Sequence, residues 1–198
     1  MLFRSTKRKI INTCKKASND RVPLIVGVMD SGTKLVLRNI HDAYDNGADY
    51  VLTTPPNFYH LSQEEMKYFF LEIAEHSKLP VIMYNCSWAK NQLSPESVYE
   101  MSRHPNIVAL KETSNMVNLQ RMKAVLNERD NFILVSGEEY LFLPALAIGI
   151  KAFFMGGPGN IFPKLCMDII FDYNNLKLED ASRKYNSMFA FLHELYNM

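Results

Sequence analysis

Short apolar runs rich in β-branched and aromatic residues recur along the chain, with their centres about 20 to 30 residues apart. Between them lie polar segments with helical periodicity, of which residues 62–78 and 118–129 are the clearest. Strands that are apolar throughout and alternate with helices are typical of a parallel sheet covered by helices. The sequence therefore predicts an α/β fold with strands within PLIVGV (23–28), DYVLTTP (49–55), PVIMYN (80–85), NIVALKE (106–112), NFILVSG (131–137) and KAFFMGG (151–157).

Local signals mark several ends of the predicted helices. Ser62 is followed by acidic residues and predicts a helix N-cap. Ser94, followed by Pro95, predicts a second N-cap. Gly47 and Gly149 stand where helices should give way to strands. These signals support the alternation of helices and strands.

Two architectures satisfy this alternation: an open doubly wound sheet and a (β/α)8 TIM barrel. The even spacing, and the lack of a Gly-rich turn after the first run, favour the barrel. A complete barrel usually needs about 250 residues, whereas this chain has 198 and six predicted strands. We therefore expect a single, incomplete TIM-barrel domain spanning residues 1–198. Either two strands are absent or a partner covers the exposed sheet edges.

Composition excludes several classes of protein. The chain is 47% hydrophobic and 22% charged with a net charge of +1, which is ordinary for a soluble globular protein and gives no argument for nucleic acid or an anionic membrane. No apolar run approaches the roughly 20 residues of a membrane helix. The three cysteines, Cys14, Cys86 and Cys166, form neither a disulfide framework nor a zinc pattern. A reducing, cytoplasmic location is therefore expected.

The first 21 residues are basic but lack the continuous apolar segment of a secretory signal. Their apolar side chains fit one face of an amphipathic helix. The residues of this face are Leu2, Ile10, Ile11 and Cys14. A mitochondrial presequence is the alternative interpretation.

One lysine and one tyrosine stand at the carboxyl ends of predicted neighbouring strands, where TIM-barrel active sites lie. These residues are Lys111 and Tyr84. A lysine must lose its proton to attack a carbonyl, and a desolvated site favours the neutral amine. The resulting iminium accepts electrons from an adjacent carbon, and a neighbouring phenol can relay protons. The alternative is a lysine that extends from a strand end into water.

Several motifs together carry a resemblance to a known family. They are PLIVGV, Gly47-Ala48-Asp49 leading into TTPPNFYHLSQEE, LPVIMYN, HPNIVALKETS and ILVSGEE. From about residue 20 to the C-terminus the chain resembles the dihydrodipicolinate synthase / N-acetylneuraminate lyase family of class I aldolases and lyases. The resemblance implies a TIM barrel that acts on small molecules and needs no metal or organic cofactor.

The resemblance also implies roles for individual residues. Lys111 would form a Schiff base with pyruvate or a related 2-oxo acid, and Tyr84 would shuttle protons and orient the substrate carboxylate. Thr113 would either hydrogen-bond the site or cap the next helix. Gly137 and Glu139 match positions that contact a polyhydroxylated substrate chain in lyase members.

Glu138 and Gly156 each allow a second interpretation. Glu138 is better explained as a helix start. The pair beginning at Gly156 replaces hydroxyl-bearing residues and would offer backbone contacts only. The segment GGPGN, which begins there, is a weak signal for a phosphate cradle.

Two departures from the family pattern stand out. Many members complete the proton relay with a tyrosine from a neighbouring subunit; that position holds Phe58, and the adjacent Tyr59 is the candidate substitute. The family also begins with two further strands, the second ending in a Gly-Thr-Thr-Gly-Glu type loop that holds the substrate carboxylate. This sequence lacks that loop, so we expect a member truncated at both ends, with strands 3–8 present and strands 1–2 missing. A homo-oligomer is expected; the alternative function is an inactive structural or interaction subunit.

Overall fold

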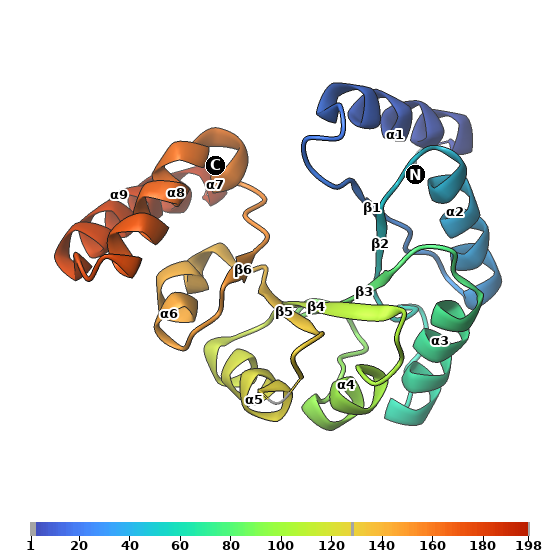
Figure 1. The fold of residues 1–198 in the computed structure, drawn as a ribbon. Coiled ribbons are helices and arrows are strands. Elements are labelled where there is room, and N and C mark those ends of the chain that lie inside the picture. The colour runs from blue at the N-terminus through green and yellow to red at the C-terminus, as the bar shows by residue number, and fades with distance from the viewer. Residues whose placement is uncertain (1–2, 128, 198) are drawn as a thin grey trace. The chain divides into compact units, whose positions relative to one another are not determined.

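A computed structural model describes residues 3–127 and 129–197 (Figure 1). Its helices and strands alternate along the chain, as the spacing of apolar runs predicts. In chain order they are α1 (Arg4–Ser18), β1 (Ile25–Gly27), α2 (Thr33–Asp45), β2 (Tyr50–Thr53), α3 (Gln63–His76), β3 (Val81–Cys86), α4 (Pro95–Met101), β4 (Ile107–Thr113), α5 (Met116–Leu126), β5 (Ile133–Ser136), the 3-10 helix η1 (Glu139–Leu141), α6 (Phe142–Ala147), β6 (Ala152–Phe153), α7 (Pro158–Ile161), α8 (Pro163–Asn174) and α9 (Leu178–Tyr196).

The strands form one six-stranded sheet in the order β1-β2-β3-β4-β5-β6. β1 pairs in parallel with β2, β2 with β3, and β5 with β6. This sequential order differs from a doubly wound sheet, in which the strand order reverses partway across. The protein therefore has an α/β fold consistent with part of a TIM barrel, as the sequence predicts.

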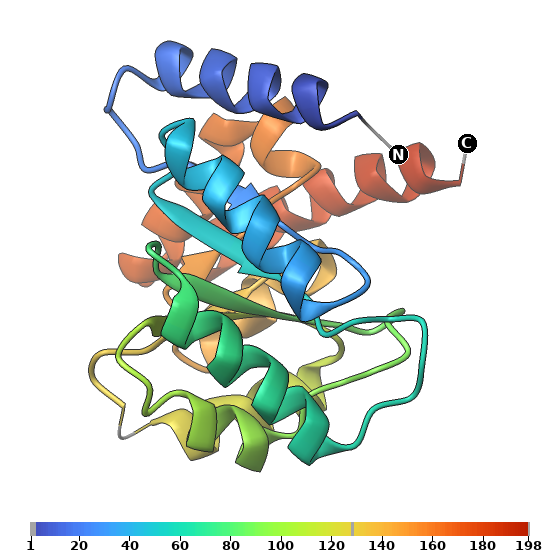
Figure 2. The same cartoon turned by 90° about the vertical axis from the view of Figure 1, so that its right-hand side faces the viewer.

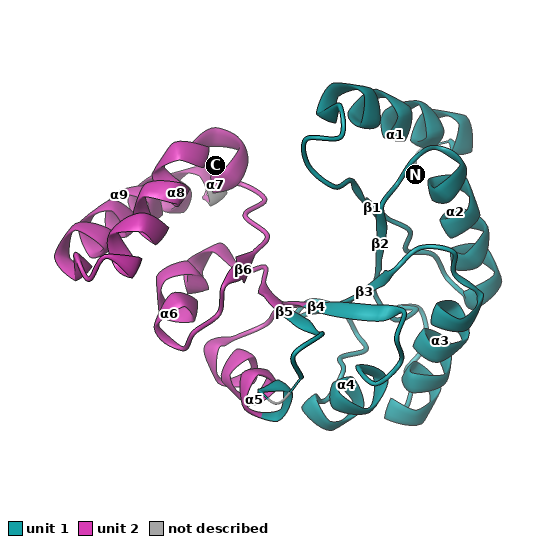
Figure 3. Cartoon of the chain, in the orientation of Figure 1, with its two compact units in different colours: residues 1–110, 125–133 teal, residues 111–124, 134–198 magenta. Residues whose placement is uncertain are grey.

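The chain divides into two compact units (Figure 3). Unit 1 comprises residues 1–110 and 125–133, and unit 2 comprises residues 111–124 and 134–198. The boundary falls inside β4, between Leu110 and Lys111. The expectation of a single domain over residues 1–198 remains a prediction.

In unit 1, helices α1 to α4 pack successively, each against the next (Figure 2). These helices and the strands that they cover together supply a core of fully buried apolar side chains. Those with no exposed surface include Val36, Phe70, Ile73, Val81 and Met83.

Side-chain caps fix where two helices of unit 1 begin. The Ser62 hydroxyl accepts a hydrogen bond from the Glu65 N–H, and the Glu65 carboxylate accepts one from the Ser62 N–H at 2.7 Å. Ser94 caps α4, whose first residue is Pro95. Both predicted N-caps are confirmed.

The N-terminal helix α1 is present, but its predicted apolar face is only partly correct. Ile11 is buried, whereas Ile10 and Cys14 are exposed; Leu2 lies outside the described residues. Ion pairs hold the helix as well, because Arg4 and Arg8 both donate hydrogen bonds to the Asp42 carboxylate on α2. The polar contact with Asp42 thus takes the place of part of the predicted apolar face.

Unit 2 has its own apolar core, built mainly where α8 and α9 pack together. Its buried members are Phe142, Leu146, Cys166, Ile169, Met188 and Leu192. Gly149 precedes β6 with φ +82°, a left-handed conformation that favours glycine. Gly47 does the same before β2 in unit 1, with φ +88°. Both glycine positions are as predicted.

The sixth strand is much shorter than predicted. β6 covers only Ala152–Phe153, whereas the apolar run spans 151–157. The chain leaves the sheet after Phe153, turns at Gly156 and Gly157, and enters α7 at Pro158. Across the described part of the chain, no helix has the length and apolar character needed to cross a membrane.

Candidate active site

Strand β4 sets the position of Lys111 at the sheet's carboxyl edge. Alternation along a strand places Lys111 and Thr113 on one face and Glu112 on the other. Lys111 is half-buried, and Thr113 is 2% exposed. The face shared by these two side chains is therefore the candidate site in unit 2.

Gly137 lies directly against that face, just after β5. Its N–H donates a hydrogen bond to the Glu112 carbonyl at 2.9 Å. A Cβ at Gly137 would stand 2.5 Å from both Lys111 Cε and Thr113 Cγ2, a separation that real Cβ atoms do not show. The structure thus brings Lys111, Thr113 and Gly137 together, and only glycine fits beneath the lysine side chain.

An aromatic ring that the sequence reasoning missed lies on another side of the lysine. Lys111 Nζ is 5.7 Å from the centroid of the Phe154 ring. Phe154 follows β6 directly, and its N–H donates to the Ser136 carbonyl at 2.9 Å. The available signal was its position at the end of the sixth apolar run, where a phenylalanine resembles an ordinary core residue.

Two neighbouring glutamates take different structural roles. Glu138 caps η1 by accepting a hydrogen bond from the Tyr140 N–H, which confirms the predicted helix start. Burial raises the pKa of the Glu138 carboxyl, and the Glu139 charge adds to this, while the Tyr140 N–H and the Lys111 charge oppose it. Burial is therefore the main cause of the raised Glu138 pKa, and the Lys111 charge makes the smallest contribution.

Glu139 binds backbone at the start of α7. Its Oε1 accepts a hydrogen bond from the Gly157 N–H at 3.1 Å. Gly156 is exposed, and its carbonyl accepts a hydrogen bond from the Asn160 side chain. The phosphate-cradle interpretation of GGPGN does not fit, because the Gly157 N–H already has an acceptor and Pro158 has no N–H. Substrate contacts by Glu139 and Gly156 remain predictions.

Asn115 caps the helix that follows β4. Asn115 immediately precedes α5, and its Oδ1 accepts a hydrogen bond from the N–H of Asn118, in the first turn of the helix, at 3.0 Å. Asn118 in turn donates to the Glu112 carboxylate at 3.1 Å. The role of Thr113 in the site remains a prediction.

Tyr84 occupies the predicted strand end, in unit 1. It is half-buried on β3, and the following Asn85 is fully buried. The Asn85 amide accepts from the Leu93 N–H at 2.9 Å and donates to the Leu93 carbonyl at 3.3 Å. Asn85 therefore holds the loop after β3, while the chemical role of Tyr84 remains a prediction.

The loop that follows β2 presents two aromatic side chains to solvent. Phe58 and Tyr59 are 74% and 72% exposed, with ring centroids 4.8 Å apart in an edge-to-face contact. The buried Asn91 holds this loop: its Nδ2 donates to the carbonyls of Pro56 at 2.6 Å and Tyr59 at 2.7 Å, and its Oδ1 accepts the Leu61 N–H. The sequence reasoning missed Asn91, since nothing local distinguishes it. The relay role of Tyr59 remains a prediction.

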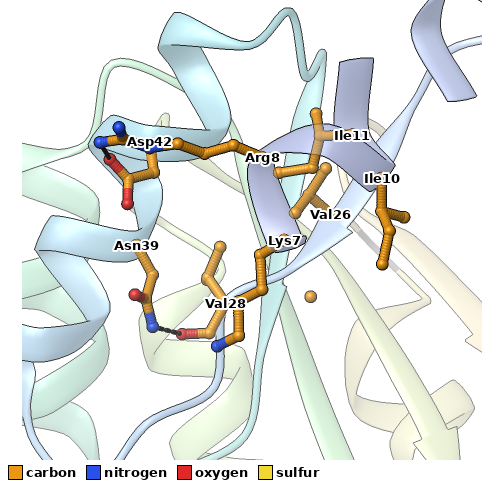
Figure 4. Close-up of a pocket in the computed structure, with 9 residues that line it drawn as sticks. Lys7, Arg8, Ile10, Ile11, Val26, Val28, Asn39 and Asp42 are labelled. Atoms are coloured by element: carbon orange, nitrogen blue, oxygen red, sulfur yellow. Dashed lines mark hydrogen bonds and ion pairs between the residues drawn. The ribbon is translucent and has the colours of Figure 1, made fainter. Parts of the chain in front are cut away.

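Unit 1 also contains a cavity of about 250 Å³ between α1, β1 and α2 (Figure 4). Its walls combine hydrocarbon from α1 and β1 with the Arg8–Asp42 ion pair and Asn39, whose amide donates to the Val28 carbonyl. The Arg4 hydrogen bond holds the pKa of the Asp42 carboxyl well below its usual range, with a further contribution from Arg8. None of the predicted site residues lines this cavity, which we call the β1-edge cavity.

The residues that the structure describes contain no group of three or more His, Cys, Asp or Glu side chains arranged to hold a metal ion. All three cysteines are free thiols, and Cys14 is the exposed one. The candidate site is thus a lysine in a polar and aromatic setting.

Fold and site together define a protein with sequential βα topology and a lysine at the carboxyl end of a sheet strand. The sequence model of the Dihydrodipicolinate synthetase family matches residues 1–198. The chain belongs to this family.

Its relatives include 4-hydroxy-tetrahydrodipicolinate synthases from several bacteria. The chain is 31% identical to the enzyme of Leptospira biflexa over 180 residues, which cover 90% of this chain and 60% of that protein. It is 30% identical to the enzyme of Bacillus velezensis over 196 residues, covering 97% of this chain and 67% of that protein. The chain therefore spans about 60% of the length of the first of these relatives.

Solved structures show the same fold. Dihydrodipicolinate synthase from Bacillus anthracis superposes with a TM-score of 0.89 and 25% identity, covering 95% of this chain and 64% of that one. A Clostridium difficile protein in complex with mannosamine superposes with a TM-score of 0.90 and 20% identity, covering all of this chain and 67% of that one. At the lower identity the similarity concerns the fold alone.

Proposed function

We propose that this chain carries the Schiff-base lysine of a carbon–carbon lyase or aldolase acting on pyruvate or a related 2-oxo acid. The observation that carries the proposal is the placement of Lys111: its side chain lies over Gly137 at the carboxyl end of β4. A strand-end lysine against bare backbone has the freedom to reach a carbonyl carbon without leaving the strand edge.

The chemistry follows from an amine at that position. The Lys111 amine adds to the C2 carbonyl of the 2-oxo acid, and loss of water leaves a protonated imine. Loss of a proton from C3 gives an enamine, whose electron pair forms a bond to an aldehyde carbon. The reverse sequence breaks that bond, and hydrolysis of the imine returns the free amine. No external oxidant or reductant is consumed.

The other predicted residues take supporting roles in this proposal. Tyr84 relays protons and orients the carboxylate, and Thr113 hydrogen-bonds the site. Gly137, Glu139 and Gly156 bound the region where the second substrate sits. Tyr59 is proposed as the phenol supplied from a neighbouring copy in a homo-oligomer.

The relatives support this proposal at the level of the family. A prophage protein of the dihydrodipicolinic acid synthase family from E. coli K12, which shares the fold with a TM-score of 0.87 and 19% identity, has been crystallised with pyruvate. We propose that the six strands correspond to the third to eighth of the family barrel, and that the reaction takes place in the cytoplasm. The chain spans about 60% of the length of a relative. We therefore also propose that the residues present in this chain are enough for the reaction.

Borohydride trapping tests the proposal. Incubation with pyruvate and borohydride should reduce the imine and leave a stable 1-carboxyethyl group on the Lys111 peptide, detected by mass spectrometry. Lys111→Arg should abolish the adduct, because a guanidinium does not form the imine. Lys151 is exposed at the opposite end of a strand, before β6, so Lys151→Arg is the matched control and should leave the adduct unchanged. An unmodified Lys111 peptide in the wild-type chain would refute the proposal.

A specific observation favours a second candidate function, that of an interaction subunit. Within the described residues β1 is the end strand of the sheet, and it is hydrogen-bonded to β2 alone. The β1-edge cavity lies beside it, lined by Ile10, Ile11, Val26 and Val28. An unpaired edge beside apolar side chains is a surface to which a further strand can add.

A further inference from the structure

We propose that Phe154 is a specificity-determining residue, whose ring limits the size of the group that a 2-oxo acid carries next to its carbonyl. This inference rests on the proposed function, because it requires an imine on Lys111. It goes beyond the proposed function by predicting selection against 2-oxo acids that are branched at C3.

The ring and the amine are each held in place by contacts within unit 2. Gly137 supports the Lys111 side chain from below, so the lysine cannot sink further toward β5. The Phe154 backbone is hydrogen-bonded to Ser136. The preceding Phe153 packs its ring against Phe142, with centroids 4.9 Å apart, and belongs to the apolar core. The ring of Phe154 is therefore attached to a fixed strand end.

The distance between amine and ring decides what fits. Lys111 Nζ lies 5.7 Å from the Phe154 centroid. In an imine, two covalent bonds place the first substituent carbon about 2.5 Å from the nitrogen. A substituent directed at the ring is then left roughly 3 to 4 Å from it, the ordinary range of carbon contacts. A methyl group fills this space, and a further carbon on the same side overlaps the ring.

Branching at C3 strengthens the restriction. A linear chain on C3 can turn its extra carbon away from the ring. An acid with two methyl groups on C3 keeps both of them away from Phe154 only in the single rotamer that directs its C3 hydrogen at the ring, so the other rotamers are lost. Discrimination by one methyl group against a fixed wall is worth roughly 10- to 200-fold.

The ring also has an electrostatic effect on the intermediate. A cation within about 6 Å of an aromatic centroid is attracted to the ring face, and the protonated imine carries its positive charge at the lysine nitrogen. Replacing the ring should therefore reduce the amount of trapped pyruvate imine by roughly two- to five-fold. This effect applies equally to both acids and does not change their ratio.

A competition experiment separates specificity from folding. Wild-type protein is incubated with pyruvate and 3-methyl-2-oxobutanoate at equal concentration and trapped with borohydride, and the two adducts on the Lys111 peptide are quantified by mass spectrometry. The ratio of adducts is independent of the fraction of folded protein and of how much is trapped. We expect Phe154→Ala to shift the ratio at least ten-fold toward the branched acid, with Phe154→Leu in between.

A variant outside unit 2 serves as the control. Phe58→Ala removes an exposed ring in unit 1 and should leave the ratio unchanged. A pyruvate adduct whose ratio to the branched adduct is the same in wild type and Phe154→Ala overturns this inference and leaves the proposed function standing. No adduct from either acid in the wild-type chain overturns the proposed function and this inference with it.

Discussion

Glycine at position 137 is a requirement of the lysine site rather than of the backbone. Its φ is not in the left-handed region, so the turn itself does not demand glycine. What excludes a side chain is the close approach of Lys111 Cε and Thr113 Cγ2, each 2.5 Å from an added Cβ. The lysine end can move aside, whereas the β-branched threonine has little rotamer freedom.

We expect Gly137→Ala to displace the lysine and to slow formation of the pyruvate adduct at least ten-fold. Overpacking should also lower the free energy of unfolding by about 1–3 kcal/mol. Trapping rates and urea denaturation measure the two effects. Gly32→Ala is the control, because no atom lies within 4 Å of the added Cβ there. An unchanged trapping rate in Gly137→Ala would show that the lysine does not depend on this contact.

At the scale of elements, α1 is attached to α2 mainly through charge. Asp42 is 5% exposed and receives hydrogen bonds from Arg4 and Arg8. These bonds hold its pKa well below the usual range in the folded chain. A carboxyl with a lowered folded-state pKa contributes stability above its unfolded pKa, near 3.9, and loses that contribution as the pH falls through the folded value.

Asp42→Asn should therefore destabilise the protein at pH 7, lowering the melting temperature by roughly 2–4 °C. The difference from wild type should be constant near neutrality and shrink below about pH 4, where the carboxyl takes up a proton in the unfolded chain before it does so in the folded one. Thermal unfolding followed by circular dichroism over this range measures both. Asp45→Asn, at an exposed position on the same helix, is the control. If the difference in melting temperature between wild type and Asp42→Asn instead grew on acidification, the stabilising role of the charged Asp42 carboxylate would be contradicted.

Elements were more predictable from the sequence than contacts between them. The strands and the caps at Ser62 and Ser94 depend on residues close in the chain, so local patterns reveal them. Asn91 holds carbonyls about 30 residues away, and nothing near it in the sequence indicates those partners. Lys111 was visible because a cation ends an apolar run. Phe154 was not, because a phenylalanine at a strand end is also what a core requires.

At the scale of the molecule, the open side of β1 is the feature with a consequence for assembly. In a parallel pair, alternate residues direct their N–H and C=O groups to the same neighbour. Val28 N–H and the Leu24 carbonyl bond to β2. The N–H and C=O groups of Ile25 and Gly27 therefore face the open side, where a strand from a second chain can bond.

We expect Gly27→Pro to weaken self-association without unfolding the chain. Proline at this position removes one of the two N–H groups that face the open edge, and it is tolerated on edge strands, while the bonds to β2 are kept. Light scattering across a concentration series should show oligomers for wild type and for the control Gly27→Ala, which keeps the N–H. A wild-type chain that stays monomeric throughout the series would eliminate the second candidate function.

The match between strand order and chain order has a consequence for synthesis on the ribosome. Each strand of the sheet has as its neighbour the strand just made or the strand made next. β1, β2 and β3 can thus pair as soon as they leave the exit tunnel, before the residues of β5 and β6 have been translated. Contacts of short sequence separation also form with a small loss of chain entropy. The nascent chain can in this way acquire its hydrogen-bonded ladder stepwise, in the direction of translation.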